Sequence, residues 1–383
     1  MSRNDFEYAR ERKFFAVTAR GVEEYACREI AALGAGECQV ERGGVYFRAD
    51  HPSLYRIVFC SRLLNAVLAP LASFDCHSDT DLYRRAFAMD WAAIFTPEHT
   101  FAVRAVVAES RISHSQYAAL RLKDAIVDRF RAHTGKRPSV DPRQPDVWLH
   151  LHLHRDRAVI SLDVSGGAMH RRGYRRMPYS APLKETLAAF LIEMSGWQGD
   201  RPLLDPFCGS GTILAEALLS AGRIPPAFMK AHFGFEFMPD FDDSAWQAVR
   251  RRAEQERQEG GYEALHGSDV DEQAIAAARA NLAMIPGGQQ VKLRHADFRD
   301  LPDFTDGVIV CNPPYGVRLG EASALTGLYR DLGNFLKRRC RGSVAYILCG
   351  NRELIPFIGL RPRWRKPVFN GPLECRFLRF DLY

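Results

Sequence analysis

The stretch PLLDPFCGSGTILAEALLSA, residues 202–221, decides the fold of the second half of this chain. A short apolar run comes first, then an acid, then two glycines one residue apart, and then an apolar segment of helical length. Glycine adopts left-handed backbone conformations and allows close approach of a ligand, and a helix N-terminus favours an anionic group. A strand, a glycine turn and a helix in this order predict the start of a doubly wound α/β sheet that binds a ligand at the turn.

Strand and helix signals continue to alternate after this stretch. Further strands are expected within residues 264–271, 291–298, 307–316, 343–350 and 374–383. Helices separate most of them, and a charged insertion over 223–262 is expected to contain one more helix at Ser244–Gln258. This alternation predicts a Rossmann-like domain over residues 181–383, built on a mostly parallel, seven-stranded sheet.

The first half of the chain follows a different pattern. Its strands and helices are mixed without a regular βαβ repeat, which predicts an α+β fold. A helix capped by Ser78 is expected at Asp79–Ala88, and two facing strands are expected at 147–154 and 158–164. The predicted divisions are a flexible N-terminus (1–12), a first α+β subdomain (13–62), a second one (63–165), a basic linker (166–180) and the Rossmann-like domain (181–383).

Positive charge is unevenly distributed along the chain. Residues 1–180 contain 27 Lys or Arg and 21 Asp or Glu, whereas residues 181–383 contain 25 of each. Most of the excess is arginine, which forks onto phosphate better than lysine does. The N-terminal half therefore has either a polyanionic partner or simply a well-solvated basic surface.

Composition also indicates where the protein works. No run of about eighteen apolar residues is present, so no part of the sequence is expected to span a membrane. The polar N-terminus has no apolar signal core, and the nine cysteines never form a C-x-x-C pair. A cytoplasmic protein with reduced thiols and no metal is the expectation.

A second informative stretch is VIVCNPPYG, residues 308–316. Three β-branched residues suit a buried parallel strand, and the prolines after Asn312 hold the backbone rigid and extended. DPFCGSGT (205–212) followed about one hundred residues later by CNPPYG (311–316) resembles the paired signature of S-adenosylmethionine-dependent methyltransferases that act on exocyclic amino groups. GSDVD (267–271) and HADF (295–298) stand at strand ends where that family places acids.

The resemblance implies how S-adenosylmethionine would be held. Its ribose hydroxyls would bind Asp269, its adenine would pack on Val270, and the adenine amino edge would meet Asp297 and Phe298. The residues expected to line its methionine end are Asp205, Phe207, Gly209, Ser210, Gly211 and Thr212. Because the third glycine of a dinucleotide fingerprint is absent, NAD is a poor fit. Three other acids could bind the ribose in place of Asp269, and the alternative is that they lie in a solvated turn. They are Asp240, Asp242 and Asp243.

The resemblance also gives residues 312–315 a catalytic role. An aromatic exocyclic amine is a weak nucleophile, because its lone pair is delocalised into the ring. The side-chain oxygen of Asn312 and the carbonyl of Pro313 would accept its hydrogens and turn the lone pair towards the methyl group. Pro314 adds rigidity, and Tyr315 would stack on a base that is flipped out or already single-stranded. Neither a metal nor a strong base is required.

Two other groups of residues suggest competing chemistry. Cys208 and Cys311 suggest a cysteine nucleophile, although the Pro-Cys pair that such methyltransferases use is missing. His150, His152 and His154 alternate and so share one face of a strand. They form either a metal site or an exposed face, and their spacing of about 7 Å is wide for a single ion.

The N-terminal half resembles a particular group of RNA-modifying enzymes. FFAVTARGVEEYACREIAALGA (14–35), SQYAALRLKDAIVDRFR (115–131) and HRRGYRRMPYSAPLKETLAA (170–189) are similar to the ferredoxin-like module, the THUMP module and the connector of the ribosomal large-subunit methyltransferase L family. This resemblance implies an enzyme that methylates N2 of a guanine in 23S rRNA. The expected partner is 23S rRNA or a large-subunit assembly intermediate, and the expected oligomeric state is a monomer. The expected phosphate contacts in the connector are Arg171, Arg172, Arg175 and Arg176.

Three other functions compete with this interpretation. They are N2-methylation of a tRNA guanine, N6-methylation of a DNA adenine, and a non-catalytic role in RNA binding or assembly. The family often continues into a second methyltransferase domain that makes 7-methylguanine. This sequence stops at Tyr383, so only the first activity is expected.

Overall fold

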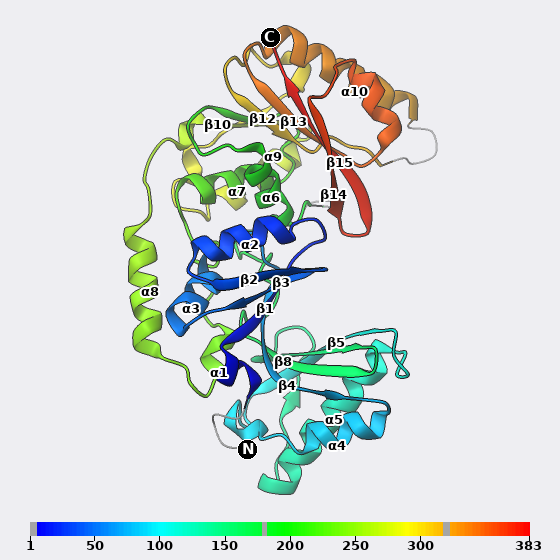
Figure 1. The fold of residues 1–383 in the computed structure, drawn as a ribbon. Helices are drawn as coiled ribbons and strands as arrows, with labels where there is room; N and C mark the ends of the chain where they lie inside the picture. The colour runs from blue at the N-terminus through cyan, green and yellow to red at the C-terminus, as the bar shows by residue number, and fades with distance from the viewer. Residues whose placement is uncertain (1–5, 178–181, 317–321) are drawn as a thin grey trace. The chain divides into compact units, whose positions relative to one another are not determined.

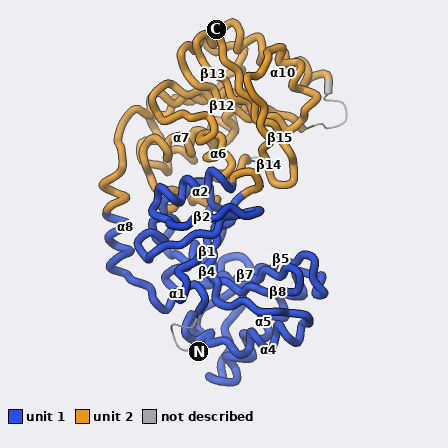
Figure 2. The backbone as a smooth tube through the Cα atoms, in the orientation of Figure 1, with its two compact units in different colours: residues 1–18, 23–169, 230–251 blue, residues 19–22, 170–229, 252–383 orange. Residues whose placement is uncertain are grey.

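The computed structural model describes residues 6–177, 182–316 and 322–383. The chain forms two compact units, which Figure 2 shows in different colours. Unit 1 contains residues up to 18, residues 23–169 and residues 230–251, and the remainder forms unit 2. Each unit is built on one β-sheet.

Unit 1 has an eight-stranded sheet in the order β2-β3-β1-β4-β8-β7-β5-β6 (Figure 1). Its strands are β1 (Lys13–Val17), β2 (Gly36–Glu41), β3 (Gly44–Arg48), β4 (Ala66–Asp75), β5 (Thr100–Ala108), β6 (Ser139–Val140), β7 (Val147–His154) and β8 (Arg157–Asp163). β4 pairs antiparallel with β1 on one side and with β8 on the other. The predicted subdomains 13–62 and 63–165 therefore share a single sheet, which β4 joins.

Unit 1 also contains most of the helices of the N-terminal half. They are α1 (Glu7–Glu11), α2 (Glu23–Ala32), α3 (His51–Cys60), α4 (Asp79–Phe87) and α5 (Ser115–Thr134). The hydroxyl of Ser78 accepts a hydrogen bond from the backbone N–H of Asp81 and caps α4, as predicted. α4 and α5 lie side by side, and α5 packs on β5.

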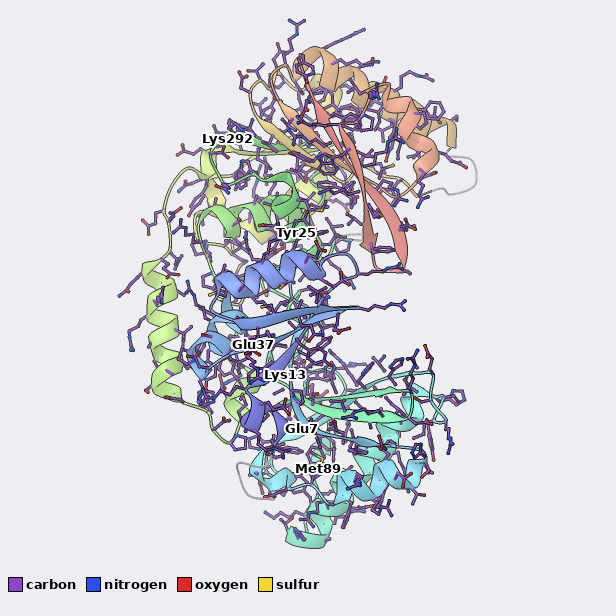
Figure 3. All side chains as sticks on the ribbon, viewed as in Figure 1. Glu7, Lys13, Tyr25, Glu37, Met89 and Lys292 are labelled. Carbon is purple, nitrogen blue, oxygen red and sulfur yellow. The ribbon has the colours of Figure 1, made fainter. Side chains whose placement is uncertain are left out.

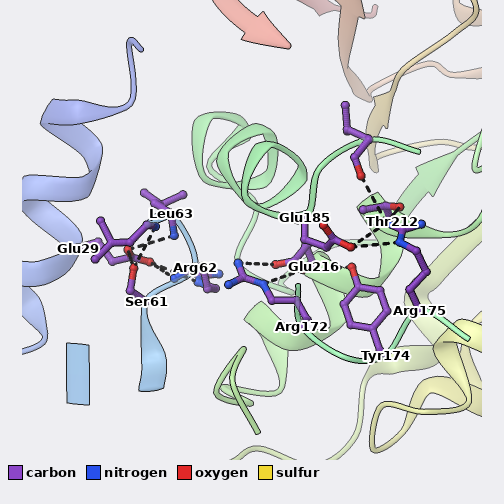
Figure 4. A network of polar contacts seen from close by, with 12 residues as sticks. Glu29, Ser61, Arg62, Leu63, Arg172, Tyr174, Arg175, Glu185, Thr212 and Glu216 are labelled. Carbon is purple, nitrogen blue, oxygen red and sulfur yellow. Dashed lines mark hydrogen bonds and ion pairs between the residues drawn. The ribbon is translucent and has the colours of Figure 1, made fainter. Parts of the chain in front are cut away.

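Two carboxylates tie helices of unit 1 to their neighbours. Glu29 of α2 accepts a hydrogen bond of 2.5 Å from the hydroxyl of Ser61, the residue that follows α3 (Figure 4). Glu7 of α1, labelled in Figure 3, accepts hydrogen bonds of 2.7 Å from both the backbone N–H and the hydroxyl of Ser73 in β4. Each carboxylate thereby accepts hydrogen bonds from donors of Ser61 or Ser73 that would otherwise need water.

Residues 230–251 differ from the predicted domain division. The boundary at residue 181 assigns them to the C-terminal domain, but they pack in unit 1. They include a 3₁₀ turn at Gly234–Phe237 and most of α8 (Asp243–Gln255). Trp246 of α8 is buried, with its ring 5.2 Å from that of Phe59 and 6.3 Å from that of Tyr55. Burial of this large aromatic surface explains why the insertion belongs to unit 1.

Unit 2 has the predicted seven-stranded sheet, in the order β11-β10-β9-β12-β13-β15-β14. Its strands are β9 (Leu203–Asp205), β10 (Leu265–Asp269), β11 (Lys292–His295), β12 (Val308–Cys311), β13 (Val344–Cys349), β14 (Trp364–Asn370) and β15 (Leu373–Asp381). The first five strands in chain order pair in parallel, and β14 and β15 pair antiparallel. β14 was not predicted, because Pro367 and its charged neighbours are atypical of a strand; as an edge strand it tolerates a proline.

Helices cover both faces of the unit 2 sheet (Figure 1). They are α6 (Glu185–Ser195), α7 (Thr212–Ala221), α9 (Glu272–Leu282) and α10 (Ala322–Arg339). α10 packs with the 3₁₀ segment Arg352–Ile358 over a core that includes Ile309, Ile347 and Leu378 of the sheet. Within the described residues, no helix is long and apolar enough to cross a membrane.

The variant Trp246→Ala should destabilise unit 1, because it removes the buried indole ring that packs against Tyr55 and Phe59. We expect the free energy of unfolding, measured by urea titration and circular dichroism, to fall by about 3–5 kcal/mol. Arg251→Ala on the exposed side of the same helix is the control and should change stability by no more than about 0.5 kcal/mol. Equal stability of the two variants would contradict the assignment of residues 230–251.

Candidate functional site

The glycine turn follows directly from the end of β9 at Asp205. Gly209 has a φ of 52° and Gly211 a φ of 81°, and both values lie in the left-handed region that favours glycine. A Cβ on Gly211 would also lie only 3.1 Å from the Cβ of Ala278 in α9. α7 begins immediately afterwards at Thr212. The turn therefore needs glycine both for its backbone conformation and for its packing.

Asp269 at the end of β10 fixes this turn. One of its carboxylate oxygens accepts a hydrogen bond of 2.8 Å from the backbone N–H of Gly209, and the other accepts one of 3.0 Å from Asp271. β9 and β10 are parallel neighbours, so their carboxyl ends lie together. Val270 follows with 68% of its surface exposed, an apolar side chain free to pack on a ligand.

Asp205 is an unusual group within the turn. Its side chain is buried, and one oxygen accepts a hydrogen bond of 3.1 Å from the backbone N–H of Phe207. Burial, and secondarily the negative charge of Asp269, raise the pKa of Asp205 to about 8. Asp205 is therefore largely protonated near neutral pH and can donate a hydrogen bond.

The third strand end carries Asp297 and Phe298. Asp297 accepts hydrogen bonds from the backbone N–H and the guanidinium of Arg299, which fixes the start of a short 3₁₀ turn. The ring of Phe298 is buried, 5.0 Å from that of Phe207. Asp297 itself is partly exposed, with 29% of its side chain accessible, whereas Phe298 is part of the interior.

The residues after β12 combine a buried acceptor with a held aromatic ring. The side-chain oxygen of Asn312 is buried and has no hydrogen-bond partner among residues 6–177, 182–316 and 322–383. The hydroxyl of Tyr315 accepts a hydrogen bond of 3.1 Å from the side-chain amide of Asn370. Its ring lies so close to Gly350 that a Cβ there would be 2.3 Å from it. An unpaired buried acceptor costs about 1–3 kcal/mol, so Asn312 is suited to a donor from a ligand.

These strand ends lie along one edge of the sheet. β10, β9 and β12 are consecutive parallel strands, which brings Asp269, Asp205 and Asn312 to the same side. Ligands of open α/β sheets bind at this edge. The residues expected to hold the cofactor and those expected to act on the substrate are therefore brought together.

The linker arginines do not share one role. Arg172 has a side chain only 2% exposed, which pairs with the buried Glu216 of α7 at 3.4 Å. Arg175 pairs with Glu185 at 2.9 Å and contacts the glycine turn (Figure 4). The prediction that Arg172 and Arg175 contact RNA phosphates does not agree with this burial and pairing. Arg171 is exposed, as is Arg176, so these two remain available to a phosphate.

The rival ribose ligands have structural partners in unit 1. Asp240 accepts a hydrogen bond of 2.8 Å from Tyr8 and lies 2.9 Å from the ring nitrogen of His51, so it is not part of a fully solvated turn. Asp242 accepts a hydrogen bond from Ala245 at the start of α8, and Asp243 is already within that helix. None of the three follows a strand of the unit 2 sheet, whereas Asp269 does.

The competing nucleophile and metal interpretations are not supported. Cys208 and Cys311 are buried, and burial raises the pKa of both thiols well above the usual value. A thiolate nucleophile requires the opposite shift. His150 lies 3.5 Å from the buried carboxylate of Asp163. In the part of the chain that the structure describes, no three His, Cys, Asp or Glu side chains are placed to hold a metal ion.

Comparison with known families agrees with this arrangement. A family model described as "RMKL-like, methyltransferase domain" matches residues 172–379. The chain belongs to this methyltransferase family. A THUMP domain model matches residues 76–163, and an RlmL ferredoxin-like domain model matches residues 13–68. The predicted family and the predicted fold of both halves are confirmed.

Two curated relatives resemble nearly the whole chain. "Putative RNA methyltransferase slr0064" of Synechocystis sp. is 41% identical over 376 residues, which cover 98% of both proteins. "Ribosomal RNA large subunit methyltransferase K/L" of Syntrophotalea carbinolica is 40% identical over 97% of this chain but only 53% of its own length. The chain thus spans about half of the second relative.

A similar solved structure is that of a complex with SAH. SMU.472, described as a putative methyltransferase complexed with SAH, superimposes with a TM-score of 0.85 at 26% identity, covering 97% of this chain and 98% of that one. SAH is the product that S-adenosylmethionine leaves after methyl transfer. The family match makes the protein a methyltransferase, and its THUMP domain indicates RNA as the partner.

Asp205→Asn should change how stability depends on pH. The folded-state pKa of about 8 lies above the value of about 4 for an unfolded aspartate. The folded protein therefore keeps a proton that the unfolded chain has released, and stability decreases as pH rises through this window. Asparagine keeps the shape but does not titrate, so the variant should gain stability relative to the wild type between pH 4 and 8. Parallel urea-unfolding curves across this range would contradict the shift.

Proposed function

We propose that this protein transfers a methyl group from S-adenosylmethionine to the exocyclic N2 amine of a guanine in 23S rRNA. The side-chain oxygen of Asn312, beside two prolines, is buried and has no hydrogen-bond partner among the described residues. This observation supports an amine, which can donate a hydrogen bond to it, as the methylated group. The choice of ribosomal RNA is supported by the 40% identity to the K/L methyltransferase over almost the whole chain. The substrate is 23S rRNA, free or within a large-subunit assembly intermediate, and the working unit is a monomer.

The chain's own residues activate the amine by position. The side-chain oxygen of Asn312 and the carbonyl of Pro313 accept the two amine hydrogens, which directs the nitrogen lone pair out of the ring plane. Pro314 keeps the backbone extended, and Tyr315, held by Asn370, stacks on the base. S-adenosylmethionine supplies the electrophilic methyl group when bound. The nitrogen gains the methyl and loses one proton, which water can accept.

The cofactor fits the strand-end edge. Its methionine carboxylate would lie near the turn around Gly209 and Gly211, at the N-terminus of helix α7, which favours an anionic group. Its ribose hydroxyls bind Asp269, which has already fixed the turn through the Gly209 N–H. The exposed Val270 packs on the adenine, and the backbone of residues 297–298 meets its amino edge. Asp205, protonated at neutral pH, lies under the methionine end.

A methyl-transfer assay tests the substrate directly. The purified full-length protein, supplied with radiolabelled S-adenosylmethionine, should label a 23S rRNA transcript, and mass spectrometry of the digested RNA should show N2-methylguanosine. Labelling of tRNA instead would favour the alternative RNA substrate, and N6-methyladenine in duplex DNA would favour the DNA adenine methylase. Absence of transfer to any of the three would leave the non-catalytic RNA-binding role.

Asn312→Ala should separate cofactor binding from chemistry. Loss of one hydrogen-bonding group used in the transition state should reduce the methyl-transfer rate by about two to three powers of ten. SAH affinity, measured by calorimetry, should stay within a factor of about two, because Asn312 is not among the cofactor residues. Asn334→Ala on α10 serves as the control and should keep wild-type turnover. Near-normal turnover of Asn312→Ala would exclude its proposed role.

RNA affinity of the full-length protein should fall steeply as salt increases, because phosphate contacts release counterions. Arg171→Gln, which changes an exposed linker arginine, should reduce the slope of log affinity against log salt by about one. Arg251→Gln, an exposed arginine of α8, is the control for a general loss of charge. A slope near zero for the wild type would exclude phosphate binding as the source of affinity.

A further inference from the structure

Two side chains of the linker, Arg172 and Tyr174, are buried in the interior of unit 2. Arg172 and Tyr174 both contact the carboxylate of Glu216 in α7, with Tyr174 donating its hydroxyl at 3.2 Å (Figure 4). Tyr174 is one of the largest fully buried side chains, and Glu216 is fully buried too. Burial raises the pKa of Glu216, and the Arg172 guanidinium opposes that rise. Separation of Arg172 from Glu216 would leave a buried charge unpaired, which is costly. The backbone around Arg172 is therefore held in one conformation.

Arg175 then reaches the glycine turn from the linker. Its guanidinium donates at 2.9 Å to the hydroxyl of Ser210 and at 3.2 Å to that of Thr212. The same group pairs with Glu185 at 2.9 Å and donates to the carbonyl of Leu183 at 3.4 Å. Ser210 stands between the two glycines with positive φ, and Thr212 is the first residue of α7. The planar guanidinium of Arg175 therefore holds both Ser210 within the turn and Thr212 at its end.

Asn281 links the same segment to the turn a second time. It is fully buried in α9, an unfavourable place for an unsatisfied amide. Its side-chain nitrogen donates to the carbonyl of Ser210 at 3.0 Å, and its oxygen accepts from the backbone N–H of Arg176 at 2.8 Å. A single amide thus satisfies the turn on one side and the linker on the other.

The turn is consequently held from two directions. Asp269 accepts from Gly209 on the sheet side, and Arg175 and Asn281 hold Ser210 on the linker side. A peptide with two left-handed glycines has high conformational freedom, and it receives a ligand tightly only when its backbone is already aligned. The contacts with Arg175 and Asn281 supply that alignment.

We propose that Arg175 and Asn281 are positioning residues for the cofactor, so that the linker acts on the S-adenosylmethionine site through Arg175 and the backbone of Arg176. This rests on the proposed placement of the methionine end at the glycine turn. The linker then has a second task besides joining the two halves of the chain. Arg175 sets the geometry of the turn, and variants of Arg175 alter cofactor affinity although its side chain does not touch the cofactor.

Matched lysine variants test the proposal. Lysine keeps the charge but lacks the fork, so Arg175→Lys cannot hold Glu185, Ser210 and Thr212 together. We expect SAH affinity of the full-length protein, measured by calorimetry, to fall about tenfold, as for the loss of one to two hydrogen bonds. Arg172→Lys makes the same change three residues earlier, where the side chain does not touch the turn. It should lower the melting temperature while SAH affinity stays within about twofold.

Kinetics distinguish positioning from general damage. Arg175→Lys should raise the KM for S-adenosylmethionine about tenfold and leave the KM for RNA unchanged, and saturating cofactor should restore kcat. Asn281→Ser, which shortens the bridging amide, should show the same pattern. Wild-type SAH affinity in both variants, or an equal loss in Arg172→Lys, would overturn the positioning role. Failure of the wild type to bind SAH would instead contradict the cofactor placement itself.

Discussion

The hydrogen bond between the Gly209 N–H and the Asp269 carboxylate is the contact on which the site depends. It joins the ends of two parallel strands and holds the glycine turn in a conformation that only glycine adopts easily. Everything else at this edge is placed relative to that turn. α7 starts from it, Val270 follows Asp269 into solvent, and Asn312 ends the strand next to β9.

Buried charge is concentrated beside this contact. Asp205, Glu216 and Arg172 all lie within the interior, where an unpaired charge is costly. Two of them form a pair, and Asp205 avoids the cost by holding its proton. Side chains with strongly shifted pKa values are frequent at functional sites.

The sequence predicted the motifs well because their chemistry is local. A glycine turn after a strand and an Asn before two prolines can be recognised in the sequence alone, and the structure places both at strand ends as expected, while their roles stay predictions. Burial was harder to predict. The sequence indicates that Arg172 and Arg175 are surface arginines, but in the structure they pair with Glu216 and Glu185. Only their spacing within the short linker distinguishes them from the exposed Arg171 and Arg176. The lone asparagine at position 281, inside an apolar helix, was a signal that could have been used.

The place of residues 230–251 depends on packing between distant parts of the chain, which periodicity does not reveal. Trp246 completes the aromatic layer around Tyr55 and Phe59, although β9 and α7 of the other unit come before it in the chain. During synthesis, therefore, the first sheet cannot acquire its last layer until residue 251 has left the ribosome. By then β9, the glycine turn and α7 have already been synthesised, so unit 1 completes its packing only after the first strand and helix of unit 2 have been made.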